Sequence, residues 1–222
     1  MFKKVVIYIL MFYSISNYYD FFNWYFSKDQ IIIEDALILS LLSSTPMFLA
    51  LVLIHIFYYP TNFVDRARVI SFPPIIFLFF VNLAFLVSMT NMYYFQIYDL
   101  PRQLDILRSL PIGVLLILVA LVVLYFSLRE FTKINEDPIP TSPSNQIIKD
   151  NVYAYSRNPM YLALLILQIG LGMLLSVIHI IFFVFFTYLV FKYYVIIPEE
   201  KYLEDKFGKE YLNYKKSVRR WF

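Results

Sequence analysis

The sequence predicts an all-α integral membrane protein, from its composition, its long apolar runs and the placement of its charges. Hydrophobic residues make up 60% of the 222 residues and charged residues only 16%, whereas a soluble domain carries about 25% charged residues. Several apolar runs approach or exceed the about 20 residues that a helix needs to cross a bilayer. We expect about six transmembrane helices, the last two forming a helical hairpin, followed by a C-terminal amphipathic helix.

Four apolar segments form the expected N-terminal transmembrane region, residues 1–128. The second contains Pro46 directly after Ser43-Ser44-Thr45, so the proline should kink this helix and the hydroxyl groups can bond the freed carbonyls. The third and fourth begin with proline, which suits a first helical turn because its missing N–H is not needed there. The segments are Val5–Phe26, Ala36–Tyr58, Pro73–Phe95 and Pro111–Leu128.

The expected C-terminal module, residues 129–222, contains a longer apolar run, Met160–Ile197. At ~1.5 Å per residue this run is twice the length of one span, so it should form a hairpin that turns near Gly172–Ser176. Gly170 and Gly172 would allow its two arms to approach closely. The polar groups available for chemistry lie in the loop before this hairpin and in the tail after it.

The charges orient the expected helices. With six crossings and a cytoplasmic N-terminus, only three of the 19 Lys and Arg residues fall outside, namely Lys28, Arg102 and Arg108. Cytoplasmic segments of membrane proteins carry an excess of Lys and Arg, and this arrangement follows that rule. We expect a multi-pass protein of a bacterial or archaeal inner membrane, or of the endoplasmic reticulum, with both termini and the polar module in the cytoplasm.

Composition argues against several kinds of chemistry. The chain has no Cys, which rules out disulfides, thiolate nucleophiles and Cys-ligated metals. Its two His residues, His55 and His179, stand alone in apolar runs, and its four Gly residues cannot form a nucleotide-binding loop. The tail after Pro198 alternates charged residues with apolar and aromatic ones, Tyr211 and Tyr214 among them, as an amphipathic helix on a lipid surface would. Its five acidic residues argue against nucleic acid. We expect membrane lipids, and neither metal nor nucleic acid, as partners.

The hairpin should bring two polar sequences together, because its arms start and end on the same membrane face. Arg157-Asn158-Pro159-Met160-Tyr161 precedes it and Pro198-Glu199-Glu200 follows it. A cation, an amide, a phenol and two carboxylates would then line one pocket over an apolar floor, as in many ligand sites. Lys192, seven residues before Glu199, would lie two helical turns away on the same face.

Each of these residues also has a purely structural interpretation. Asn158-Pro159 is typical of the first positions of a helix. Glu199-Glu200 suits the first turn of a new helix after Pro198, where the helix dipole favours anions. Arg157 and Tyr161 fit the usual distribution of cations and aromatic residues in membrane proteins. The residues alone leave a ligand site and a set of helix ends equally open.

Four pieces of the C-terminal module resemble the isoprenylcysteine carboxyl methyltransferase family, which is similar in turn to membrane phospholipid N-methyltransferases. They are Asn145-Gln146-Ile147-Ile148, the run from Val152 to Tyr161, Glu199-Glu200 and Phe207-Gly208-Lys209-Glu210-Tyr211. Each piece is short, but their combination around an apolar hairpin is specific. The resemblance covers the chain from Asn145 onward and none of the first four apolar segments.

The resemblance implies S-adenosylmethionine as methyl donor, bound on the cytoplasmic side without a Rossmann fold, and a lipid-like or lipidated methyl acceptor. It implies that Glu199 binds the amino group of the methionine part of this cofactor. The candidate cofactor-binding residues are Asn145, Gln146, Ile147, Ile148, Tyr153, Asn158, Pro159, Met160, Tyr161 and Glu199. The candidate catalytic residues are Arg157, Glu200 and Lys192.

Three positions depart from the family pattern. Asn151 stands in place of a Gly, Asn158 in place of a His, and Val195 in place of an Arg that faces the substrate in prenylcysteine enzymes. The last departure weighs against a prenylcysteine acceptor, because Arg grips a carboxylate with two hydrogen bonds. Methylation of a phospholipid amine or of a small thiol stays open. Outside the methyltransferases, the alternatives are a non-catalytic membrane scaffold and a nicotinamide-dependent membrane reductase, since sterol reductases resemble this module.

Overall fold

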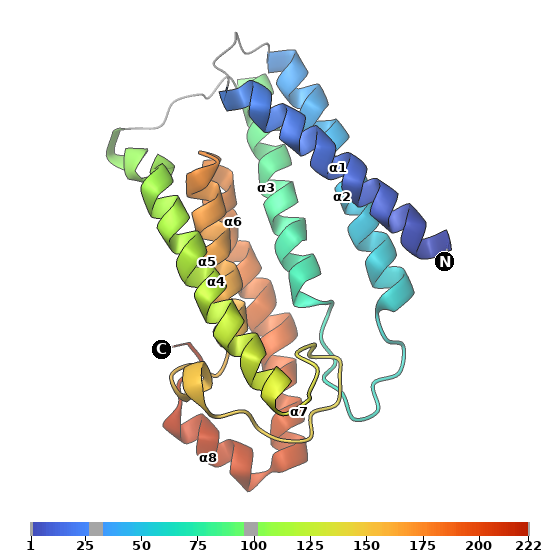
Figure 1. Ribbon diagram of the computed structural model, residues 1–222, viewed down its shortest axis with the longest axis vertical. Coiled ribbons are helices and arrows are strands. Elements are labelled where there is room, and N and C mark those ends of the chain that lie inside the picture. Colours follow the sequence, from blue (N-terminus) through green and yellow to red (C-terminus); the bar gives the residue numbers. More distant parts are fainter. Residues whose placement is uncertain (1, 27–32, 96–101, 222) are drawn as a thin grey trace.

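The computed structural model describes residues 2–26, 33–95 and 102–221, and the regular elements in these ranges are helical. Lys28, one of the cations expected outside, lies beyond the described residues. The apolar helices form a bundle, and two short 3-10 helices, Arg102–Arg108 and Asn151–Ala154, lie in its connections (Figure 1). The bundle helices are α1 (Phe2–Phe26), α2 (Ile33–Tyr58), α3 (Pro73–Phe95), α4 (Leu110–Lys133), α5 (Pro159–Leu174) and α6 (Ile178–Phe191).

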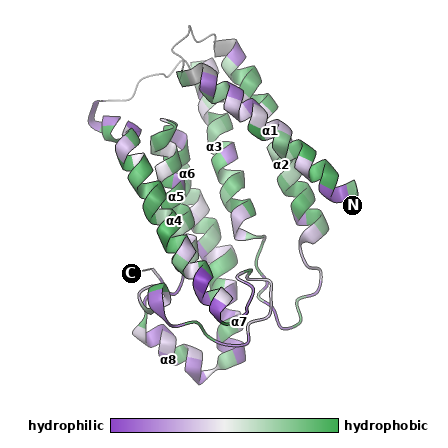
Figure 2. Ribbon diagram, in the orientation of Figure 1, coloured by the Kyte–Doolittle hydropathy of each residue, from purple (hydrophilic) through white to green (hydrophobic). Residues whose placement is uncertain are grey.

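The structure confirms an all-α, multi-pass membrane fold. Among the described residues, 5 helices are long and apolar enough to cross a membrane, and α5 is a shorter apolar helix of 16 residues. Apolar residues run along the bundle, and polar residues gather at the end that carries α7 and α8 (Figure 2). Prolines start the helices as predicted, since α3 begins at Pro73, α5 at Pro159, and Pro111 lies in the first turn of α4.

The hairpin between α5 and α6 forms where the sequence predicts it, but only one of its glycines joins the two arms. A Cβ on Gly172 would lie 2.6 Å from Cγ1 of Ile181 in α6, so this glycine lets the arms meet. A Cβ on Gly170 would instead lie 3.0 Å from the carbonyl oxygen of Gly113 in α4. Gly170 therefore serves the packing of α4 on α5, which corrects the expectation that both glycines face the other arm.

The carbonyls around Pro46 in α2 are bonded from the neighbouring helices. The Ser14 hydroxyl in α1 donates to the carbonyl oxygen of Ser43 at 2.6 Å, and the Asn82 amide in α3 donates to that of Ser44 at 3.1 Å. The Ser43 hydroxyl donates to the carbonyl of Leu39 at 2.7 Å, one turn earlier in α2. Pro46 removes the α-helical donor of the Leu42 carbonyl, four residues earlier, whereas the bonds from α1 and α3 reach the neighbouring carbonyls of Ser43 and Ser44.

The helical backbone of α6 continues through a wider π-helical turn, Lys192–Ile196, into α7 (Ile197–Phe207). Pro198 has no N–H, so the carbonyl of Tyr194, four residues earlier, lacks its α-helical donor. The N–H of Ile70, in the connection between α2 and α3, donates to this oxygen at 3.0 Å. Glu199 and Glu200 thus lie in the first turn of α7 as predicted, although α7 follows α6 without a break.

The predicted amphipathic tail is two helices rather than one. α7 ends at Phe207. The next residue, Gly208, has a φ of 53° in the left-handed region that glycine tolerates, and α8 (Lys209–Ser217) follows. After α8 the chain returns to the hairpin, where the Arg157 N–H donates to the carbonyl of Arg219 at 3.0 Å. The Trp221 ring lies 5.7 Å from that of Tyr188 in α6. The tail therefore closes the polar end of the bundle and does not extend as one helix along a lipid surface.

Candidate active site

A cavity opens at the polar end of the bundle, between the end of α4, the connection from α4 to α5, α7 and α8. The chain brings these elements together because α5 and α6 return the backbone to the same end. The lining residues include two carboxylates, an arginine and several aromatic rings around apolar side chains. They are Phe131, Glu136, Ser144, Gln146, Ile147, Ile148, Tyr153, Arg157, Glu199, Leu203, Tyr211 and Tyr214.

Two carboxylates line this cavity, and neither forms an ion pair among the described residues: Glu136 accepts backbone N–H groups, whereas Glu199 accepts a single phenol. The hydroxyl of Tyr161, a buried residue in the first turn of α5, donates to Oε2 of Glu199 at 2.7 Å. Among the described residues, Oε1 of Glu199 accepts no hydrogen bond, and no Lys or Arg forms an ion pair with this side chain. A carboxylate in a confined space without a cation is an acceptor for a positively charged ligand.

Tyr153 places an unpartnered hydroxyl at the cavity. Its side chain is 6% exposed, and within the described part of the chain its hydroxyl has no hydrogen-bond partner. The hydroxyl of Tyr214 holds Tyr153 in place by donating to its backbone carbonyl at 2.7 Å. Burial, and then the negative charge of Glu199, raise the pKa of the Tyr153 phenol well above its ordinary value. This phenol stays protonated and can donate a hydrogen bond to a ligand.

Two side chains hold the loop that carries the predicted residues 145–148. Oε1 of Glu136 accepts the backbone N–H groups of Asn145 at 2.7 Å and Gln146 at 3.1 Å. The hydroxyl of Tyr202 in α7 accepts the N–H of Ser144 at 3.1 Å. Three of the four predicted residues, Gln146 to Ile148, line the cavity, whereas the Asn145 side chain is exposed to solvent.

Arg157 and Glu200, two of the candidate catalytic residues, form a buried ion pair. Nη2 of Arg157 donates to Oε1 of Glu200 at 2.9 Å, and Nη2 of Arg220 donates to Oε2 at 2.6 Å. Nη1 of Arg157 donates to the carbonyls of Lys215 at 3.1 Å and Val218 at 2.5 Å. Glu200 is 4% exposed and does not line the cavity, whereas Arg157 does. This network fastens the C-terminal residues to the foot of the hairpin.

The three residues before Tyr161 support the site without lining it. Asn158 takes the N-cap position of α5, but its side chain makes no capping bond. Its amide donates instead to the carbonyl of Arg220 at 3.1 Å, which again anchors the tail. Pro159 is buried and Met160 is half-buried. The structure therefore brings Tyr153 and Glu199 to one cavity, and Tyr161 supports Glu199 through its hydrogen bond without lining the cavity. Asn158, Pro159 and Met160 do not line it either.

Lys192 lies away from the cavity. Its Nζ is 5.0 Å from the centre of the Tyr193 ring and 5.7 Å from that of Tyr188. The π-helical turn explains this placement, because its wider winding changes the face on which residues before and after it lie. The seven residues from Lys192 to Glu199 therefore do not make two regular turns, and the two side chains do not share a helix face.

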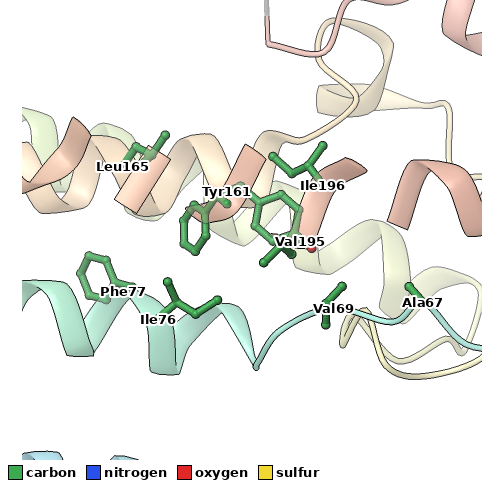
Figure 3. Packing of buried hydrophobic residues seen from close by; sticks show 9 residues of the cluster. Ala67, Val69, Ile76, Phe77, Tyr161, Leu165, Val195 and Ile196 are labelled. Atoms are coloured by element: carbon green, nitrogen blue, oxygen red, sulfur yellow. The ribbon is translucent and has the colours of Figure 1, made fainter. Parts of the chain in front are cut away.

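Val195, which departs from the family pattern, packs in the interior of the protein. Its side chain is 0% exposed and belongs to an apolar cluster between α3, α5 and α6 (Figure 3). Tyr161 and Ile196 pack in the same cluster. The departure at Asn151 also has a structural basis, since this residue has a φ of 55°, which Asn tolerates better than most residues. Its amide donates to Oε1 of Glu130 in α4 at 3.1 Å.

Sequence reasoning missed six lining residues: Phe131, Glu136, Ser144, Leu203, Tyr211 and Tyr214. Tyr211 and Tyr214 were expected on the lipid face of an amphipathic helix, but they are 2% and 6% exposed and face the cavity. Burial raises the pKa of both phenols. The two tyrosines are three residues apart, and this spacing was the sequence feature that could have indicated that they lie on the same face of α8. Within the described ranges, no group of three or more His, Cys, Asp or Glu side chains could hold a metal ion.

A match to a known protein family covers the part of the chain that supplies most of the residues lining this cavity. The model of the phospholipid methyltransferase family matches residues 108–210, from the connection before α4 to the start of α8. The chain is also 44% identical, over 66 residues, to a protein of Haemophilus influenzae (strain ATCC 51907 / DSM 11121 / KW20 / Rd) described as an uncharacterized protein. That alignment covers 28% of this chain and 98% of the relative. No solved structure shows a significant similarity to the chain.

Proposed function

Since this chain belongs to the phospholipid methyltransferase family and is thereby a membrane methyltransferase, we propose that it takes a methyl group from S-adenosylmethionine and transfers it to a lipid-like acceptor. The cavity at the polar end of the bundle is the proposed cofactor site. The family match includes all of its lining residues except Tyr211 and Tyr214.

The observation that carries this proposal is the Glu199 carboxylate. It lines the cavity, it is oriented by Tyr161, and no cation of the described residues pairs with it. The amino group of the methionine part of the cofactor is a cation that fits this carboxylate. A hydrogen bond between two charged groups is about twice as strong as one between neutral groups. The neighbouring Glu200 cannot play this part, because Arg157 and Arg220 already occupy both of its oxygens.

The aromatic lining fits the positive charge at the sulfur of the cofactor. Phe131, Tyr153, Tyr211 and Tyr214 surround the cavity, and aromatic faces attract cations. The free hydroxyl of Tyr153 adds a hydrogen-bond donor for a polar atom of the ligand. The carboxylate, the rings and this donor together match a zwitterionic ligand that also carries a sulfonium group.

Bound S-adenosylmethionine supplies an activated methyl group, so the chain needs no nucleophilic side chain of its own. The protein has to hold donor and acceptor in line and to exclude water, because orientation alone can supply a large part of the rate. Ile147, Ile148 and Leu203 give the cavity apolar walls for this purpose. Arg157 acts as a positioning residue, since its guanidinium fixes Glu200 and the tail beside the cavity.

A lipid amine is the acceptor that the residues support better than a prenylcysteine carboxylate. Val195, in place of the expected Arg, is fully buried among apolar residues, and Lys192 does not line the cavity. Arg157, the cation that lines the cavity, is already bonded to Glu200 and to two backbone carbonyls, so it is not free to grip a substrate carboxylate with two bonds. Parallel methyl-transfer assays with phosphatidylethanolamine, a prenylcysteine analogue and a small thiol separate these acceptors. Carboxyl methylation that is lost in Lys192→Ala would overturn the preference.

We infer from the distribution of cations that the cofactor cavity faces the cytoplasm. Because the chain has no Cys, a single introduced Cys reports its own side of the membrane. Gln103→Cys lies exposed before α4, and Asn213→Cys lies exposed on α8. An impermeant thiol reagent should label Gln103→Cys from outside intact cells and should label Asn213→Cys only after lysis. The reverse pattern would contradict this orientation.

Calorimetric titration of the detergent-purified protein with S-adenosylhomocysteine tests the proposed cofactor. Saturable binding is expected, and methylthioadenosine should bind more weakly because it lacks the amino group proposed for Glu199. Titration with NADPH serves as the second arm. Binding of NADPH without binding of S-adenosylhomocysteine would favour a reductase, and binding of neither would favour a non-catalytic scaffold.

A further inference from the structure

A second cavity lies in the bundle itself, between α2, the residues before α3, α3 and α6. We call it the α2–α3 groove. Its volume is about 380 Å³, within the about 300–1,000 Å³ usual for ligand pockets. Eight of its ten lining residues are apolar, and the other two are His55 and Ser71. Only Val190 belongs to the part of the chain that the family model matches, so the groove is not a feature of that module.

The polar residues of the groove lie at one end of it. His55 is in the last turn of α2 and Ser71 precedes α3, and Nδ1 of His55 lies 2.9 Å from Oγ of Ser71. The helices run from this end into the bundle, so Val52 and Phe79 lie deeper. At ~1.5 Å per residue, Phe79 is about 9 Å further along α3 than Pro73. The groove therefore has a polar rim and an apolar interior, the polarity of a membrane lipid with its headgroup at the rim.

An apolar cluster connects the groove to the proposed reaction site. Ile76 lines the groove and packs in the same apolar cluster as Tyr161 and Val195 (Figure 3). Tyr161 donates from the other side of this cluster to Glu199 in the cofactor cavity. Ile70, which lines the groove, bonds through its N–H to the carbonyl of Tyr194 just before α7.

We propose that the α2–α3 groove binds a hydrocarbon chain of the lipid acceptor, with the polar part of that lipid at His55 and Ser71. The proposal rests on the proposed function and assigns a role to helices that the family match does not include. The groove is bounded by three helices, which distinguishes it from the open faces of the bundle that any bilayer lipid covers. A chain held there is lined by Val52, Ile75 and Phe79, and the lipid enters from the membrane without leaving it.

Photolabelling tests the proposal with a phosphatidylethanolamine that carries a diazirine in one acyl chain, presented in phosphatidylcholine vesicles containing the whole protein. Peptide mapping should find the label on Val52, Ile75 and Phe79 more than on Leu118, a 55% exposed residue of α4. Val52→Trp should fill the groove and lower its labelling about tenfold, which corresponds to about 1.4 kcal/mol of binding free energy. Val52 is 52% exposed, so this substitution need not disturb the packing of the bundle.

Leu118→Trp is the matched control, because it places the same side chain on an exposed helix position away from the groove. It should leave the labelling of the groove unchanged. Even labelling of α2 and α4 in the unchanged protein, or equal labelling of the groove in both variants, would show bilayer lipid only and would overturn the proposal. S-adenosylhomocysteine binding is measured on the same samples. Loss of that binding would count against the proposed cofactor, whereas loss of groove labelling alone counts against the lipid site.

Discussion

Polar side chains between the first three helices differ from those at the cofactor cavity in whether they have hydrogen-bond partners. Between α1, α2 and α3, the hydroxyl of Tyr18 donates to Oδ1 of Asn82 and lies 3.2 Å from Oγ of Ser44. The amide of Asn82 donates to the carbonyl of Ser44, so each of these three side chains has a partner. At the cavity, the buried hydroxyl of Tyr153 has no partner among the described residues. Glu199, which is half-buried there, accepts one hydrogen bond, on Oε2, from the described residues.

This difference separates polar residues that join helices from polar residues that await a ligand. A buried polar group without a partner costs about 1–3 kcal/mol, so a fold keeps one at a cavity where a ligand supplies the missing bond. A polar group therefore indicates a ligand site only where it both lacks a partner and lines a cavity. Gln168 and His179 each also have one unpartnered buried atom, but neither residue lines the cofactor cavity.

The largest effect should come from Glu200→Gln, which breaks the ion-pair network beside the cavity. The Arg157 side chain is 7% exposed, and removing its counter-charge leaves a buried cation unpaired. Breaking such a pair costs about 3–5 kcal/mol. Denaturant titration in detergent should show this loss in the free energy of unfolding. Glu210→Gln is the control, because its partner Lys149 and Glu210 itself are exposed and an exposed pair contributes about 0–1 kcal/mol. Similar small losses in both variants would contradict a supporting role for Glu200.

Glu199→Gln should separate binding from stability. We expect it to weaken S-adenosylhomocysteine binding about ten- to a hundredfold, because a hydrogen bond to a charged group contributes about 1.5–3 kcal/mol. Folding without ligand should be unaffected, since no cation of the described residues depends on this carboxylate. Calorimetry and denaturant titration on the same preparation measure the two quantities. Equal, near-zero effects of Glu199→Gln and Glu200→Gln on binding would return both residues to the role of helix-start carboxylates.

Two tyrosine-to-phenylalanine substitutions test the comparison directly. Tyr153→Phe removes a buried hydroxyl without a partner, so it should raise the free energy of unfolding by up to about 1–3 kcal/mol and weaken S-adenosylhomocysteine binding by about 1 kcal/mol. Tyr18→Phe removes a hydroxyl bonded to Asn82, so it should lower the stability by about 0.6 kcal/mol, the average for such bonds between membrane helices, and leave binding unchanged. Reversed results would mean that hydrogen-bond completeness does not distinguish the two regions.

The fold was largely readable from the sequence because hydrophobic length and proline position fix where membrane helices begin. The starts of α3 and α5, the hairpin and its turn follow from these local features. The path from α6 into α7 does not, since it depends on the N–H of Ile70, which is remote in sequence. Periodicity also could not separate a lipid-facing aromatic from a cavity-facing one, and this is why Tyr211 and Tyr214 were assigned to the lipid surface.

The site was readable only in part for the same reason. The hairpin brings Tyr161 and Glu199 together through topology alone, which the sequence contains. Arg220 bonds Glu200, and a backbone carbonyl of the tail bonds Arg157. No local sequence pattern predicts these contacts, and they place both residues in a structural network. Lys192 was placed by counting residues along a regular helix, and a π-helical turn invalidates that count.

The smallest effect is expected from removing an ion pair that connects the residues before α3 to α7. Asp65, before α3, binds Nζ of Lys206 in α7 at 2.6 Å, and the hydroxyl of Tyr202 also donates to it. The hydrogen bond from Lys206 lowers the pKa of Asp65, so its contribution to stability is present above the ordinary value of about 3.9 and is lost as the pH falls through the lower folded value. Asp65→Asn should therefore lower Tm slightly and equally at about pH 7 and about pH 5, and the difference should shrink below about pH 4. Thermal unfolding of both proteins across this range measures it. A difference that already disappears between pH 7 and pH 5 would assign this contribution to another titrating group, and no difference at any pH would mean that the Asp65–Lys206 pair does not stabilise the protein.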